Sequence, residues 1–244
     1  MPTDTKLPEL PSNMKQLPRD DVGRPIPFFV AYVDGKPDFR IVDPPKLIAC
    51  VVKQLCWVCG ERLNRLRHST VPRGTFVAGP MCVVNGTSAE PPSHAACAEW
   101  SAKACPFLTR PAKERRIGGL DAINVERSGG VMLDRNPGVT ALIDSERWSF
   151  HQVSADPEIN SQGGVLCRFS RVASIRWMKE GVNASPHDVM KALDEGLPAL
   201  VEIAQLDPHG MRALAHKTRD ALRWVGEHPG IDRYPVVASV LAEL

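Results

Sequence analysis

The sequence predicts an α+β protein, in which a cysteine-rich module is followed by a small antiparallel sheet and then by C-terminal helices. Three observations predict this arrangement. Six of the seven cysteines lie between residues 50 and 105. Short β-favouring runs, separated by glycine, proline and aspartate, occupy residues 120 to 182. The last 60 residues carry paired helix-start signals, each a capping residue followed by proline.

Composition narrows the class of protein. Apolar residues make up 43% of the chain, which is enough for a folded core. Lysine and arginine total 30 against 28 acidic residues, so the net charge of +2 gives no argument for binding to nucleic acid or to a membrane surface. No run of about 18 apolar residues occurs, and the amino terminus lacks the apolar core of a signal peptide. We therefore expect a cytoplasmic protein without membrane contact.

The first half of the chain reads as two segments. Residues 1–45 contain a proline-rich extended arm and then a β-hairpin, because two β-favouring runs flank Asp34-Gly35. Residues 46–108 form the cysteine-rich module. It opens with KLIACVVKQL, which periodicity leaves open between strand and helix. A second hairpin is expected around Gly79-Pro80, and a helix is expected from Ser93 to a stop at Pro106.

The second half begins after a basic linker at residues 109–119. Residues 120–244 are predicted to form a sheet and then a helical region, which may also share one body with the module. The expected strands are GVMLD, TALID, WSFHQV, VLCRFS and VASIRWM. The expected helices begin at Ser185-Pro186 and Asp207-Pro208.

Four residues of the module have the spacing of a metal site. Cys56 and Cys59 form one Cys-x-x-Cys turn, followed by a glycine, and His94 and Cys97 form a second pair at the start of the predicted helix. Residues three apart on a helix share a face, and the positive end of the helix dipole favours thiolate. Structural zinc takes four thiolate or imidazole ligands in a tetrahedron. These residues therefore predict a structural Zn²⁺ site.

Residues 50–108 resemble the treble-clef zinc fold, in which a knuckle, a hairpin and a helix supply the two ligand pairs. The resemblance implies Cys56, Cys59, His94 and Cys97 as ligands, although the second pair in many such domains is Cys-x-x-Cys. Cys82 remains an alternative ligand if the hairpin folds over the site. Cys105, eight residues after Cys97, is poorly placed for the same ion.

Two functional classes remain open. Four good ligands close a zinc site, which argues for a structural ion and for no catalytic residues. The alternative is a His-Asn-His-type metal-dependent nuclease, because His68, Asn85 and His94 occur in the order of that family's motif. Arg67 and the polar segment NGTSAEPPSH depart from the motif.

The segments CWVCG, GPMCVVNGTSAEPPSHAACAEWSAKACPFL and RWMKEGVNASPHDVMKAL loosely resemble uncharacterised proteins carried by phages, prophages and other bacterial mobile elements. This resemblance implies a bacterial or phage cytoplasmic protein with a role in phage–host conflict. We expect it to be non-enzymatic and to bind another macromolecule, with a protein favoured over DNA and no small-molecule substrate.

Overall fold

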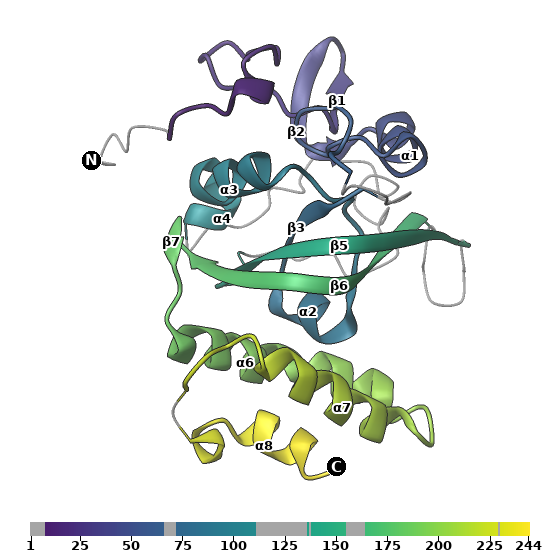
Figure 1. The fold of residues 1–244 in the computed structure, drawn as a ribbon, viewed down its shortest axis with the longest axis vertical. Helices are drawn as coiled ribbons and strands as arrows, with labels where there is room; N and C mark the ends of the chain where they lie inside the picture. The colour runs from purple at the N-terminus through teal and green to yellow at the C-terminus, as the bar shows by residue number, and fades with distance from the viewer. Residues whose placement is uncertain (1–7, 66–71, 111–135, 137, 155–163, 229) are drawn as a thin grey trace.

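The computed structural model describes residues 8–65, 72–110, 136, 138–154, 164–228 and 230–244. Within them the chain is a mixed α+β protein with antiparallel sheets, as predicted. A central sheet separates two groups of elements (Figure 1). The N-terminal segments and helix α3 (Ala95–Ala104) lie on one side, and helix α2 (Pro80–Asn85) lies on the other side together with the C-terminal helices. None of the described helices combines the length and apolar character that a bilayer crossing requires.

The central sheet has five strands in the order β3-β5-β6-β4, with β7 also paired to β6. Its two long strands are β5 (Thr140–Val153) and β6 (Gly164–Lys179), which pair along their whole lengths. The runs TALID and WSFHQV are therefore one strand, as are VLCRFS and VASIRWM. Within β5, the expected break is a register shift at Asp144/Ser145, because a bulge bends a strand without ending it. The predicted strand GVMLD lies outside the described residues.

Residues 8–53 contain more regular structure than an extended arm and a hairpin. A short 3₁₀ helix, η1 (Ser12–Met14), comes first, and Met14 is fully buried. The predicted hairpin is present as β1 (Val30–Val33) and β2 (Lys36–Val42). Asp34 and Gly35 both have positive φ, as a two-residue hairpin turn requires. The ambiguous run that follows is a helix, α1 (Pro44–Lys53), capped by the side chain of Asp43.

The hairpin predicted around Gly79-Pro80 is wrong. Strand β3 (Gly74–Ala78) is followed by helix α2 (Pro80–Asn85), because Gly79 is the N-cap and Pro80 occupies the first helical position. The short strand β4 (Thr87–Ser88) comes next, but it pairs with β6, whereas β3 pairs with β5. The two strands therefore belong to one sheet without forming a hairpin together.

Two short helices complete the module: α3 (Ala95–Ala104), which begins one residue later than predicted, and α4 (Pro106–Thr109). The C-terminal helices are α6 (Pro186–Ala204), α7 (Gly210–Leu222) and α8 (Pro235–Leu241), with η3 (Ile231–Arg233) before the last. Ser185 caps α6 as predicted, and Pro198 lies inside that helix without ending it. The carboxylate of Asp194 accepts the first free N–H groups of α8, which fixes α8 against α6.

One apolar core joins the sheet to the module and to the helices. Phe76 of β3 is fully buried and contacts Phe169 of β6, with 5.4 Å between ring centroids. The same core contains Cys56 and Cys97 on the module side and Leu193 on the helical side. The sheet is thus the common support on which the module is held.

Candidate metal centre

The structure brings all four predicted ligands together. The Sγ atoms of Cys56, Cys59 and Cys97 and a ring nitrogen of His94 all lie within 4.8 Å of one another. The three cysteines are buried and His94 is half-buried. Residues up to 41 positions apart in the sequence, Cys56 and Cys97, therefore belong to one compact group that could hold a metal ion.

The first pair lies on a tight knuckle. The N–H of Cys56 donates to the carbonyl of Glu61 over 2.7 Å, and the N–H of Gly60 donates back to the carbonyl of Cys56 over 2.9 Å. Gly60 has a φ of +77°, and a Cβ there would lie 2.6 Å from the ring of Phe28. Glycine at this position satisfies both the left-handed turn and the close packing of the hairpin segment.

The second pair is held by the knuckle and by β3. The N–H of Trp57 donates to the carbonyl of Pro92 over 3.1 Å, and Thr75 and Ser93 exchange two backbone hydrogen bonds of 2.8 Å. His94 is the N-cap of α3, which places Cys97 in the first turn of that helix. The sheet and the knuckle thus position both candidate ligands.

The ring of His94 is oriented for metal binding. Its Nε2 lies 3.0 Å from the carbonyl oxygen of Arg62, which can only accept, so Nε2 carries the proton. Its Nδ1 lies 3.4 Å from the sulfur of Cys59. A hydrogen bond from the far ring nitrogen to a carbonyl is the usual way in which a protein fixes the tautomer of a ligating histidine.

The geometry fits zinc. Tetrahedral Zn–S and Zn–N bonds of about 2.3 and 2.0–2.1 Å place a sulfur and a nitrogen ligand about 3.6 Å apart. The observed separation of 3.4 Å between Cys59 Sγ and His94 Nδ1 agrees with this value. A set of three thiolates and one imidazole also belongs to the ligand classes of structural zinc sites. The residues present therefore fit a zinc ion.

The electrostatics of the group favour a cation at its centre. Burial alone would raise the pKa of Cys56, but hydrogen bonds with Cys59, Cys97 and His94 outweigh burial and lower it. Hydrogen bonds with Cys56 and Cys59 raise the pKa of His94 to about 10. The protein thus stabilises a thiolate next to a positive charge, and a metal ion supplies that charge when it replaces the protons.

Each thiolate also has nearby N–H donors. The backbone N–H groups of Cys59 and His94 both donate to the sulfur of Cys56, each over 3.4 Å. The side-chain amide of Asn13 donates to Cys97 over 3.1 Å and to Cys59 over 3.4 Å. The sequence does not point to Asn13, because a single asparagine in a proline-rich segment, 43 residues before the first candidate ligand, carries no metal-site signal.

The other cysteines lie outside this group. Burial raises the pKa of Cys50 and of Cys167 to about 12 and that of Cys82 to about 11, so these thiols stay protonated at neutral pH. Cys82 belongs to α2 and Cys105 follows the far end of α3. Neither is among the residues that the structure groups around the candidate site.

The nuclease alternative gains nothing from the structure. His68 lies outside the described residues. Asn85 is exposed at the last position of α2, and His94 already belongs to the four-residue group. No observation therefore places the three residues of the motif around a second metal.

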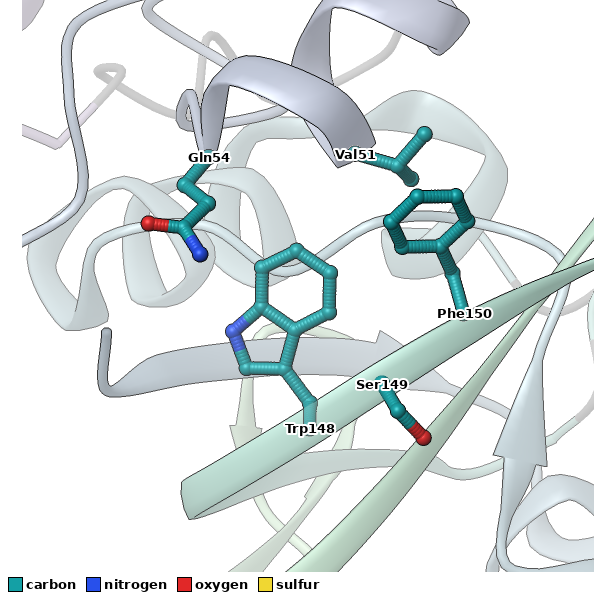
Figure 2. A pocket seen from close by; sticks show the side chains of 5 residues that line it. All are labelled: Val51, Gln54, Trp148, Ser149 and Phe150. Carbon is teal, nitrogen blue, oxygen red and sulfur yellow. The ribbon is translucent and has the colours of Figure 1, made fainter. Parts of the chain in front are cut away.

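A separate small pocket lies between α1 and β5. Figure 2 shows its five lining side chains, with Val51 of α1 and Gln54, which follows α1, above Trp148, Ser149 and Phe150 of β5. Its volume is about 190 Å³. The lining contains neither a carboxylate nor an imidazole, thiol or amine, so it offers no general acid or base.

No protein-family model, curated protein or solved structure matches this chain. The resemblance to proteins of phages and mobile elements thus has no support from comparison and stays a prediction. Between the ligand pairs, strand β3 is followed by helix α2, in place of the hairpin expected around Gly79-Pro80. The treble-clef assignment also stays a prediction, and the function has to be argued from the site.

Proposed function

We propose that this protein holds one structural Zn²⁺ ion at Cys56, Cys59, His94 and Cys97, and that it acts without catalysis as a binding protein for another macromolecule. The observation that carries the proposal is the convergence of four zinc-type ligands, with the imidazole already oriented. Four protein ligands leave no position for a water or a substrate, which is the arrangement of structural zinc sites. The ion joins the knuckle to α3.

A protein is the favoured partner because of where apolar side chains are exposed. Six of the eleven exposed large hydrophobic residues lie between residues 22 and 52. Ile48 and Val52 lie one turn apart on α1, and Tyr32 and Val33 lie on the neighbouring hairpin. Lys46 joins the two elements, since its ammonium group lies 5.5 Å from the centre of the Tyr32 ring. Exposed apolar side chains concentrated in one part of the chain are the feature that supports a protein partner.

We extend the proposal to a bacterial or phage cytoplasmic protein that acts in phage–host conflict, as the sequence resemblance implies. In such a setting the zinc module would hold the hairpin and α1 in place. Phe28 lies against the knuckle glycine, and the rings of Phe29 and Trp57 stack at 4.7 Å. Through these contacts the metal centre supports the surface that meets the partner.

The metal proposal is tested on the full chain, purified without added metal. We expect about one zinc per chain, and we expect Cys59→Ser to lower both the metal content and the melting temperature. Cys82→Ser is the matched control, because Cys82 lies outside the ligand group. Equal metal content in the wild type and in Cys59→Ser would show that the site is wrongly assigned.

Two further assays test the functional class. Plasmid DNA incubated with the protein and magnesium or manganese should stay intact. Cleavage that His68→Ala abolishes would establish the nuclease instead. Cross-linking in cells should capture a protein partner, and Val52→Glu on α1 should abolish that capture while leaving metal content unchanged. Capture that is indifferent to Val52→Glu would place the partner elsewhere on the surface.

A further inference from the structure

We infer that Asn13 is a fifth residue of the metal centre, and that it makes docking of the N-terminal segment, residues 8–17, dependent on the metal. This inference rests on the proposed zinc site. It concerns a segment that carries none of the four ligands.

The side-chain amide of Asn13 lies against three of the four candidate ligand atoms. Its Nδ2 lies 2.9 Å from His94 Nδ1, 3.1 Å from Cys97 Sγ and 3.4 Å from Cys59 Sγ. These atoms form one face of the ligand group, and the amide covers it. Thiolate sulfurs accept hydrogen bonds, so the NH₂ end of the amide must face them and the carbonyl end must face away.

The two hydrogens of the Asn13 amide match the two thiolates that have no other donor named above. An amide NH₂ group has two hydrogens, and a metal-bound imidazole no longer accepts at its ligating nitrogen. With the metal bound, the two hydrogens therefore serve the two thiolates of Cys59 and Cys97. Cys56 has its own two donors, the N–H groups of Cys59 and His94. Asn13 thus completes a set in which every thiolate accepts at least one hydrogen bond.

The net charge of the metal-loaded ligand group also favours hydrogen-bond donors around it. Three thiolates and one divalent cation carry a net charge of −1 in a buried site, and buried charge is costly unless it is hydrogen-bonded. Donors to the thiolates offset this cost and hold the ligand sulfurs in place. The hydrogen bonds of Asn13 are therefore strongest when a metal holds these sulfurs as thiolates.

The N-terminal segment, residues 8–17, contacts both elements that carry the candidate ligands, the knuckle and α3. The indole N–H of Trp100 on α3 donates to the carbonyl of Pro8 over 3.1 Å. The amide of Gln16 donates to the carboxylate of Glu61 on the knuckle over 2.6 Å. Met14, between these contacts, is fully buried in the same core as the ligand cysteines. A metal that joins the knuckle to α3 therefore also fixes the two anchors of the segment.

The test compares the wild type with Asn13→Ala, and uses Ser12→Ala as the matched control at an exposed neighbour in η1. Zinc transfer to a chromogenic chelator should be about 10- to 100-fold faster for Asn13→Ala, as for other residues that hydrogen-bond metal ligands. Trypsin cleavage after the exposed Lys15 should be faster in zinc-loaded Asn13→Ala than in the zinc-loaded control. Equal rates of transfer and cleavage in the two variants would overturn the inference.

A measurement on the wild type keeps the inference testable if Asn13→Ala does not fold. Hydrogen exchange of residues 12–17 should quicken when zinc is removed, whereas exchange in α7, on the far side of the sheet, should change little (Figure 1). Unchanged protection of residues 12–17 after zinc removal would overturn the inference. Absence of zinc from the wild type would instead overturn the proposed function, so the two failures are distinguishable.

Discussion

The Nε2 atom of His94 lies 3.0 Å from the carbonyl oxygen of Arg62, and this hydrogen bond directs Nδ1 toward the three cysteine sulfurs. Co²⁺ can replace Zn²⁺ in a tetrahedral site, and its absorption spectrum then shows which kinds of ligand bind it. We therefore consider the protein loaded with cobalt. His94→Cys should keep the metal and gain sulfur-to-cobalt charge-transfer intensity, because a fourth thiolate replaces the imidazole.

His94→Ala is the counterpart at the same position. It should lower metal content well below one per chain, and its melting curve should match that of the metal-stripped wild type. If His94→Ala kept a full complement of metal with an unchanged spectrum, His94 would not be a ligand.

Alkylation by iodoacetamide should separate the cysteines into two classes. The thiolate is the reactive form, and a pKa of about 12 leaves about one part in 10⁴ of Cys167 as thiolate at pH 8. We expect Cys167 to stay unmodified with or without a chelator. We expect Cys56, whose pKa is lowered by hydrogen bonds with its neighbours, to become modified only after zinc is removed, as mass spectrometry of the peptides would show.

The same experiment has a pH dependence with a definite sign. Burial raises the pKa of Cys167, so its alkylation rate should increase about tenfold for each pH unit between 8 and 10 while the protein stays folded. Modification of Cys56 at the same rate before and after zinc removal would contradict the site assignment.

The grouping of the four candidate ligands could be predicted in part from sequence, whereas the surrounding structure could not. The two members of each pair are three residues apart, and helix or turn geometry brings such residues together, but only the tertiary fold brings the two pairs to one place. The sequence predicts a hairpin around Gly79-Pro80, because the run after Gly79 looks strand-like. Its cap and proline are in fact helix-start signals, and the packing of α2 against the C-terminal helices decides the outcome.

Asn13 is the clearest example of a contact that the sequence does not predict. Its contacts with Cys59, His94 and Cys97 span 46, 81 and 84 positions in the chain, and neither periodicity nor composition encodes such distances. The sequence also does not predict that β5 is one long strand. The bulge at Asp144/Ser145 contains polar residues of the kind found in turns, so the sequence there looks like the end of a strand. Pairs of candidate ligands that are close together in the sequence could be predicted, whereas contacts between distant parts of the chain could not.

Gly60 and Gly23 provide a matched pair for testing the knuckle. Both have positive φ, of +77° and +80°, so alanine at either position pays the left-handed cost of about 1–2 kcal/mol. Only at Gly60 would the new Cβ also meet a neighbour, 2.6 Å from the Phe28 ring. Gly60→Ala should therefore lower the free energy of unfolding by about 1–3 kcal/mol more than Gly23→Ala. Equal losses in urea denaturation would mean that Phe28 does not pack on the knuckle.

The cap of α6 tests the C-terminal region independently of the metal. The hydroxyl of Ser185 accepts from the N–H of Asp188, and the Asp188 carboxylate accepts from the N–H of Ser185, which is a capping box. Ser185→Ala should lower the free energy of unfolding by about 1 kcal/mol. Ser185→Thr keeps the accepting oxygen and should lose much less. Zinc content should be the same in both variants, because the cap lies on the far side of the sheet from the ligands. A loss of zinc in Ser185→Ala would show that the helices and the metal module unfold as one unit.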